Sequence, residues 1–199
     1  LFLGIFIAFI AWRLGSLSNS GGVAAAITGA LIFGLGGPTW AVPLLTFFIS
    51  SSLLSRAFKR RKASFDEKFS KGSRRDGWQV FANGGLGVLF AISASLWPHV
   101  FSYFAYLGAM ATVNGDTWAT EIGVLSRSAP RLITNGKIVA GGTSGGVSAL
   151  GTLASLAGAA VIGLAAFLTR ENLDFILVAI LIGTTSISGL LGALFDSLL

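Results

Sequence analysis

Long apolar runs separated by short polar breaks dominate the pattern of the chain. Several of these runs approach or reach the 20 or so residues that a helix needs to cross a bilayer. The pattern predicts helices at about 1–14, 21–36, 38–55, 79–97, 99–115, 144–169 and 174–196. Tight turns are expected at Gly36-Gly37-Pro38 and Trp97-Pro98. Residues 1–199 are therefore expected to form a single all-α domain, a polytopic transmembrane bundle of about seven helices with a potential internal parallel repeat.

Composition and charge agree with this architecture. Hydrophobic residues make up 53% of the chain and charged residues 11%, and there is no cysteine for a disulfide or a thiolate metal site. Two polar segments, 56–78 and 116–143, fall on the same side of a seven-helix bundle, together with Arg13. That side carries 13 of the 14 basic residues, and only Arg170 falls on the other. The positive-inside rule makes it the cytoplasmic side and the N-terminus external.

Most of the net charge of +6 lies between Arg56 and Arg75. Topology and contacts with anionic lipid headgroups account for the run from Arg56 to Lys62, and a nucleic-acid partner is not expected. The pair Arg74-Arg75 differs, because it stands directly before a predicted helix. The protein is expected to be integral to a bacterial or archaeal cytoplasmic membrane or to an organelle membrane. The sequence leaves its oligomeric state open, a homo-oligomer included.

Small residues recur every four positions on two of the predicted helices. They are Gly22, Ala26, Ala30 and Gly34 on the second, and Gly151, Ser155, Ala159 and Gly163 on the sixth. Such faces allow close helix packing in lipid, and we assign them to packing rather than to chemistry. Both helices also begin with Ser-Gly-Gly-Val, at Ser20 and at Ser144, which is the basis for a parallel repeat of helices 1–3 and 5–7.

Two carboxylates, Asp116 and Glu121, follow the apolar run FSYFAYLGAM. A charged side chain at the centre of a membrane helix costs roughly 2.5–3.5 kcal/mol on insertion scales, so such residues are functional candidates by default. The alternative is an interfacial pair that caps a short helix at lower cost. The dipeptide Asn114-Gly115 predicts a helix break directly before Asp116, which favours a site.

Further oxygen-bearing side chains are expected on the same side. Gln79 and Asn83 lie at the start of the fourth helix, and Asp196 lies near the end of the seventh. Oxygen ligands without histidine or cysteine suit a hard cation such as Mg²⁺. We therefore predict that Asp116, Glu121 and Asp196 bind the metal.

The second polar segment adds a candidate anion site. Arg131 and Lys137 precede Gly141-Gly142-Thr143-Ser144-Gly145-Gly146, which leads into a predicted helix. Glycines before a helix N-terminus present backbone N–H groups to a phosphate. The segment is not a Walker A sequence, because its lysine comes before the glycines and no strand precedes it. Carboxylates, basic side chains and an anion-binding turn are the components of a phosphoryl-transfer site.

Four ordered motifs carry a resemblance that extends over essentially the whole chain. They are Arg75-Asp76 with Gln79-Val80-Phe81-Ala82-Asn83-Gly84-Gly85, then Asp116-Thr117-Trp118-Ala119-Thr120-Glu121-Ile122-Gly123, then Gly142-Thr143-Ser144-Gly145-Gly146-Val147-Ser148, and finally Asp196-Ser197-Leu198-Leu199. The chain resembles the integral-membrane family of transmembrane protein 19 and the phytyl-phosphate kinases of tocopherol biosynthesis. Thr120 departs mildly from the pattern, which has serine there.

The resemblance implies a Mg²⁺-dependent kinase that transfers phosphate from a nucleoside triphosphate to a prenyl monophosphate such as phytyl phosphate. CTP is the donor that the resemblance favours, and the lipid, the nucleotide and membrane lipids are the expected partners. Catalytic roles fall to Asp116, Glu121, Asn83 and Lys137, and phosphate contacts to Arg74, Arg75, Arg131, Thr143, Ser144, Gly145 and Gly146. Two alternatives are a transporter or lipid-binding membrane protein, and another lipid-headgroup transferase such as a nucleotidyltransferase.

Overall fold

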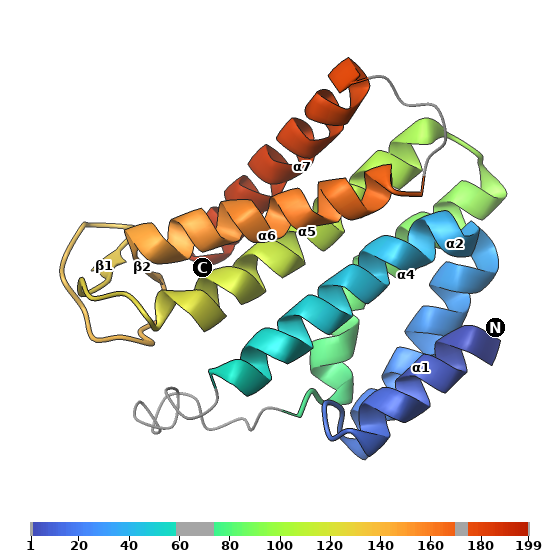
Figure 1. Ribbon diagram of the computed structural model, residues 1–199, viewed down its shortest axis with the longest axis horizontal. Coiled ribbons are helices and arrows are strands. Elements are labelled where there is room, and N and C mark those ends of the chain that lie inside the picture. The colour runs from blue at the N-terminus through green and yellow to red at the C-terminus, as the bar shows by residue number, and fades with distance from the viewer. Residues whose placement is uncertain (1, 59–73, 170–174, 199) are drawn as a thin grey trace.

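The computed structural model describes residues 2–58, 74–169 and 175–198 and is built almost entirely from helices (Figure 1). The helices are α1 (Phe2–Arg13), α2 (Asn19–Ala57), α4 (Gly77–Leu96), α5 (Val100–Gly123), α6 (Ala149–Phe167) and α7 (Phe175–Asp196). Two short strands, β1 (Arg131–Leu132) and β2 (Gly146–Val147), pair in antiparallel orientation between α5 and α6. The all-α prediction is confirmed, with six separate helices in the described residues in place of the seven predicted.

The difference in helix number comes from α2, which has a sharp bend. Gly37 within it has φ 70° and ψ −162°, a conformation that is not helical. Figure 1 shows that the second half of α2 runs back toward the end of the molecule where the helix began. Arg56, near the end of α2, donates hydrogen bonds to the Leu14 carbonyl (2.7 Å) and the Ser16 hydroxyl (2.8 Å), just before α2 begins. The reversal predicted at this glycine pair is therefore present, and α2 consists of two helical halves that meet at Gly37.

The central helix of the bundle is α5, which contacts α2, α4, α6 and α7. Tyr106, Leu107 and Met110 on α5 are completely buried. The Tyr106 ring stacks on Trp40 with 4.6 Å between ring centroids, and its hydroxyl donates a hydrogen bond of 2.5 Å to the Trp40 carbonyl. This aromatic contact holds α5 against the residues that follow the bend in α2.

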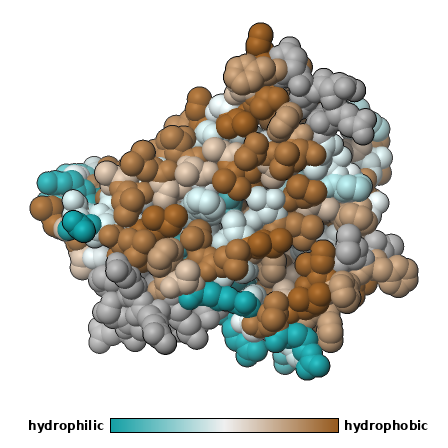
Figure 2. Space-filling model, in the orientation of Figure 1, coloured by the Kyte–Doolittle hydropathy of each residue, from teal (hydrophilic) through white to brown (hydrophobic). Residues whose placement is uncertain are grey.

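Large apolar side chains cover the outside of the bundle. Phe2, Leu53 and Phe175 are among many that are more than half exposed. Figure 2 shows hydrophobic residues over most of the visible face, with hydrophilic residues gathered near its left and lower edges. By length and composition, α2, α4, α6 and α7 could each cross a membrane, whereas α1 is a shorter apolar helix. An apolar outer surface of this kind is suited to lipid.

Polar connections gather at one end of the bundle, which we call the loop end. Arg56 joins the end of α2 to the α1–α2 turn there, and Arg75 joins the same turn through its backbone, since its N–H donates to the Ser16 carbonyl. The β1–β2 hairpin and the end of α7 lie at this end too (Figure 1). Lys59, Arg60, Arg61, Lys62, Lys68, Lys71 and Arg170, which entered the topology prediction, lie outside the described residues.

The predicted helix break at Asn114-Gly115 is wrong, because α5 continues to Gly123. Asn114 is fully buried and donates a hydrogen bond of 2.7 Å to the Gly158 carbonyl on α6, while it accepts one of 3.0 Å from Ser50 on α2. A Cβ on Gly115 would lie 2.9 Å from the Ser155 carbonyl oxygen. The pair therefore serves helix packing, and the carboxylates that follow it are helical.

Residues 144–148 were predicted as the start of a helix, whereas α6 begins at Ala149. Ser148 is its N-cap and accepts a hydrogen bond of 3.1 Å from the Gly151 N–H. The two Ser-Gly-Gly-Val segments also differ in structure, since the first lies within the opening turns of α2 and the second includes strand β2. Their likeness in sequence therefore gives no structural support to an internal repeat.

Candidate functional site

A cavity of about 580 Å³ lies at the loop end, where α5, α6, α7 and the β1–β2 hairpin meet. We call it the loop pocket. Asp116 contributes to its wall from α5, Asp196 from α7 and Ser155 from α6, while residues 141–146 line it from the hairpin. Segments from four parts of the chain thus converge on one polar cavity.

Two of the three predicted metal ligands lie together in this pocket. Asp116 is half-buried and Asp196 is exposed, and the two carboxylates are close enough to repel each other electrostatically. In the part of the chain that the structure describes, no three His, Cys, Asp or Glu side chains form a group that could bind a metal. Two carboxylates with neighbouring hydroxyls fit Mg²⁺, which in proteins is commonly bound by one or two carboxylates, waters and substrate phosphates.

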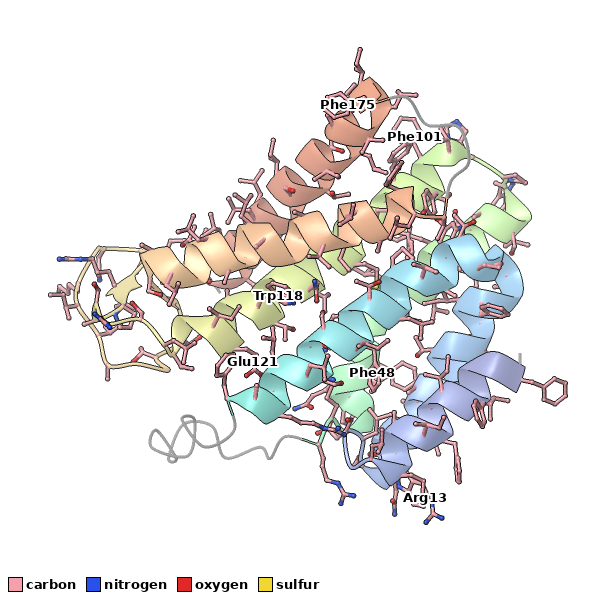
Figure 3. The ribbon with its side chains drawn as sticks, viewed as in Figure 1. Arg13, Phe48, Phe101, Trp118, Glu121 and Phe175 are labelled. Atoms are coloured by element: carbon pink, nitrogen blue, oxygen red, sulfur yellow. The ribbon has the colours of Figure 1, made fainter. Side chains whose placement is uncertain are left out.

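The third predicted ligand, Glu121, is absent from the residues that line the pocket. Five residues correspond to about 140° around a helix of 3.6 residues per turn, so Asp116 and Glu121 project from different faces of α5. Glu121 is 4% exposed and accepts a hydrogen bond of 2.5 Å from Ser55 on α2. Figure 3 shows it where the loop ends of α5 and α2 approach each other. Of the three carboxylates predicted to bind the metal, the structure therefore brings Asp116 and Asp196 together in the loop pocket and places Glu121 elsewhere.

The glycine-rich segment adopts a turn that depends on glycine at two positions. Gly142 has φ 78° and Gly145 has φ 73°, which are values that other residues rarely adopt. A Cβ on Gly145 would also lie 2.9 Å from the carbonyl oxygen of Ser197, so the turn packs closely on the end of α7. The predicted phosphate-binding residues Thr143, Ser144, Gly145 and Gly146 all line the loop pocket. The segment thus forms part of the pocket wall beside the end of α7.

Ser155 is a pocket residue that sequence reasoning assigned to packing alone. It is 2% exposed, and its hydroxyl oxygen has no hydrogen-bond partner within the described residues. A hydroxyl buried without a partner costs about 1–3 kcal/mol, which a ligand could recover. The hint in the sequence was a polar residue within an otherwise Gly and Ala stripe on one helix face.

Among the described residues, the basic residue that lines the loop pocket is Arg127, which was not predicted. Lys137 and Arg131, predicted to bind phosphate or act in catalysis, are exposed on the hairpin and do not line the pocket. The Arg131 guanidinium donates a hydrogen bond of 3.0 Å to the Gly136 carbonyl within the hairpin. Arg127 could have been found only from the hairpin pairing, which brings residues 126–130 to the wall of the same pocket.

Arg75 and Asn83 line a different cavity, between α1, α2 and α4. The Arg75 guanidinium donates a hydrogen bond of 3.0 Å to the Ser52 hydroxyl and lies 5.7 Å and 5.8 Å from the ring centroids of Phe47 and Phe48. Burial lowers the pKa of Arg75 from its ordinary value, and the negative charge of Glu121 opposes that shift. Arg75 and Glu121 therefore interact electrostatically, and each also forms a hydrogen bond with a serine near the end of α2.

Arg74 is exposed beside the α1–α2 turn, where its guanidinium lies 3.8 Å from the position of a Cβ on Gly15. The structure therefore separates the predicted single site into the loop pocket and an Arg75–Glu121 cluster, on different sides of α5. Asp116, Asp196 and the glycine turn belong to the first. Arg75 and Glu121 belong to the second.

These features define a polytopic helical membrane protein with one large polar pocket at its loop end. The chain belongs to the integral membrane protein family DUF92, whose model matches residues 2–199. The predicted resemblance to transmembrane protein 19 and the phytyl-phosphate kinases is thereby confirmed at the level of the family. No solved structure matches the chain.

Two curated relatives cover most of the chain. It is 35% identical over 213 residues to Protein PGR of Arabidopsis thaliana, a match that covers 97% of this chain and 74% of that protein. The chain is also 33% identical over 183 residues to the membrane protein MJ0933 of Methanocaldococcus jannaschii. That match covers 92% of this chain and 72% of MJ0933. The integral-membrane class therefore rests on the family and on the apolar helices together.

Proposed function

We propose that the protein is a membrane phosphotransferase that moves a phosphoryl group from a nucleoside triphosphate to a prenyl monophosphate, with CTP as the donor and phytyl phosphate as a representative acceptor. The observation that carries the proposal is the convergence of Asp116 and Asp196 with a glycine turn around one pocket. Carboxylates bind the cation that accompanies nucleotide phosphates, and backbone N–H groups of a glycine turn bind the phosphates themselves.

A magnesium ion held by Asp116 and Asp196 would neutralise charge on the donor phosphates. The oxygen-only donor set of these two residues fits that ion, and Thr120, Thr152 and Ser155, which carry hydroxyls, also line the pocket. The mutual repulsion of the two carboxylates supports the assignment, since a bound cation relieves it.

The chain's own residues orient the reactants. The turn at Gly142–Gly145 and the guanidinium of Arg127 contact donor phosphates, and Ser155 donates its hydroxyl to a phosphate oxygen at the inner end of the pocket. An oxygen of the acceptor phosphate forms a bond to the γ-phosphorus, and the bond from that phosphorus to the β–γ bridging oxygen breaks. The nucleoside diphosphate leaves with the electron pair. The acceptor is already ionised near neutral pH, so positioning and charge neutralisation suffice and no strong general base is needed.

Product identification separates this proposal from its alternatives. Purified protein in nanodiscs is incubated with γ-labelled or α-labelled CTP, Mg²⁺ and phytyl monophosphate, and the lipid products are resolved by chromatography. A kinase gives labelled phytyl diphosphate from the γ-label alone. Label in the lipid from α-labelled CTP identifies a nucleotidyltransferase instead. Absence of any lipid product, together with uptake of lipid phosphate or nucleotide into sealed liposomes, identifies a transporter.

A further inference from the structure

A second cavity runs through the half of the bundle that the loop pocket does not use. It lies between α1, both halves of α2 and the start of α4, and we call it the slot. Gly4 and Ala11 line it from α1, Ala25 and Phe33 from the first half of α2, and Ala41 and Phe48 from the second half. Each pair is seven or eight residues apart, which corresponds to about 10–12 Å along a helix. The slot therefore extends over about a third of a bilayer's hydrocarbon thickness.

Its shape suits a hydrocarbon chain. The volume is about 80 Å³, and the residues that line it come from successive turns of α1 and α2. A cavity of about 150 Å³ is known to hold benzene, and the slot has a smaller volume than that. A small volume bordered by several helical turns suits an extended hydrocarbon chain better than a ring.

The polarity of the slot changes along its length. Arg75 lies at the loop end, beside Leu17 of the α1–α2 turn. Thr28 and Asn83 come next, and they are on adjoining helices because a Cβ on Gly84 would lie 2.8 Å from the Thr28 methyl group. Gly4, Phe33 and Ala41, all apolar, line the far end. This gradient matches a molecule with an anionic head and an apolar chain.

Arg75 is well placed to hold the head. Phe47, Phe48 and the Ser52 hydroxyl fix its guanidinium against the wall of the slot. Among the described residues its side chain donates only the bond to Ser52, and a guanidinium has five N–H donors. A planar guanidinium with several remaining donors recognises a phosphate through paired hydrogen bonds.

We propose that the slot binds the first part of the chain of the lipid phosphate acceptor and that Arg75 binds its phosphate. The identity of the lipid as the acceptor rests on the proposed function. Glu121 acts electrostatically on Arg75, and it lies five residues beyond Asp116 on α5, or about 7.5 Å along the helix axis. The head of the lipid would thus stand beside the loop end of α5, on the other side of that helix from Asp116, and its phosphate would have to pass the end of α5 to reach the donor.

Photolabelling tests this inference without any nucleotide. The probe is a long-chain alkyl monophosphate with a diazirine near the phosphate end of its chain, and the matched control is the corresponding alcohol. Protein in phosphatidylcholine nanodiscs is irradiated and the labelled peptides are mapped. The monophosphate is expected to label α1 and α2 residues of the slot at least tenfold more than the alcohol. Equal labelling by the two probes would overturn the role of Arg75.

Matched variants on α2 test where the hydrocarbon chain of the probe binds. Ala25→Phe fills the slot and is expected to reduce labelling at least tenfold. Ala26→Phe, one residue further on, points to an outer groove with Trp12 and Val23 and is expected to change labelling less than twofold. Ala25→Leu is the smaller block if Ala25→Phe does not fold, as judged by gel filtration. Undiminished labelling in a folded Ala25 variant overturns the proposal.

Two further measurements are needed. The first tests which lipid the slot binds, and the second separates the lipid site from the proposed kinase activity. Unlabelled phytyl monophosphate should displace the probe, whereas phosphatidylglycerol at the same concentration should not. Displacement by both to the same extent would identify a general anionic-lipid site and overturn the assignment to the acceptor. Slot labelling in a protein that forms no prenyl diphosphate leaves the lipid site standing and removes the kinase, so the two failures are separable.

Discussion

At the residue scale, Ser155 shows how one position can serve packing and chemistry together. Its backbone and its hydroxyl both lie close to Gly115 on α5, as the small-residue stripe predicts, but Ser155 also lines the loop pocket, and its buried hydroxyl has no partner in the described residues. Sequence pattern predicts which face of a helix is buried. It does not predict that Ser155 also borders a cavity between α5 and α6. That cavity depends on where a third helix, α7, ends.

We predict that Ser155→Ala impairs nucleotide use without harm to the fold. The loss of one hydrogen bond to phosphate should raise the KM for nucleotide about two- to tenfold. The melting temperature should stay equal or rise slightly, since the removed hydroxyl has no partner to lose. Ser186→Ala is the control, because Ser186 is buried on α7 and its hydroxyl donates to the Ile182 carbonyl at 2.6 Å. An unchanged KM in the Ser155 variant would show that the hydroxyl faces no ligand.

Arg127 and Lys137 provide a second comparison at this scale. Only Arg127 lines the loop pocket, and Lys137 is exposed on the hairpin. Arg127→Ala should raise the KM for nucleotide by about tenfold or more, as expected for a lost charge-assisted contact. Lys137→Ala should change it less than threefold. Steady-state kinetics at varied nucleotide concentration measure both KM values. A larger increase in KM for Lys137→Ala than for Arg127→Ala would show that Lys137, and not Arg127, contacts the nucleotide.

At the element scale, the helices were predictable from the apolar runs, while their ends at the site were not. The turns at Gly37 and at Trp97-Pro98 fall where the sequence places them. Asn114-Gly115 looked like a helix stop because both residues favour turns, yet tertiary contacts with Ser50 and Gly158 override that preference. Once α5 extends to Gly123, helical periodicity alone separates Asp116 from Glu121.

A glycine substitution on α5 tests this packing. Gly115→Ala would place a Cβ 2.9 Å from the Ser155 carbonyl oxygen, so it should push α5 and α6 apart and lower stability by about 1–3 kcal/mol. Gly85→Ala on α4 meets no atom within 4 Å and should be neutral, or stabilising by about 0.5–1 kcal/mol. Thermal unfolding in detergent measures both. Equal melting temperatures in the two variants would mean that α5 and α6 are not in close contact at Gly115.

On the scale of the whole molecule, charge asymmetry predicted which connections share one end. The described basic residues Arg13, Arg56, Arg74, Arg75, Arg127, Arg131 and Lys137 all lie on the α1–α2 turn, at helix ends of the loop end or on the hairpin. The sequence could not show that the polar residues divide into two clusters on different sides of α5. That division follows from how α2, with its bend, packs against α4 and α5.

The chain has no cysteine, so single cysteines report topology cleanly. Asn135→Cys places a thiol on the hairpin, and Ser95→Cys places one at the opposite end, in the last turn of α4. With an impermeant maleimide, intact cells should label the Ser95 variant, and inverted vesicles should label the Asn135 variant. Labelling of both variants from the same side would contradict the bundle topology. The reverse pattern would keep the bundle and invert its orientation.

The central claim is that Asp116 and Asp196 hold the cation for phosphoryl transfer while Glu121 does not. The most direct measurement is prenyl diphosphate formation as a function of Mg²⁺ concentration for Asp116→Asn, Asp196→Asn and Glu121→Gln, with folding followed by gel filtration and melting temperature. The account predicts at least a hundredfold loss of turnover in folded Asp116→Asn and a strongly raised Mg²⁺ requirement in Asp196→Asn. Glu121→Gln should keep the wild-type Mg²⁺ dependence while losing stability, because Glu121 contacts Ser55 and acts on Arg75. Near wild-type turnover of Asp116→Asn at limiting Mg²⁺ would contradict the claim.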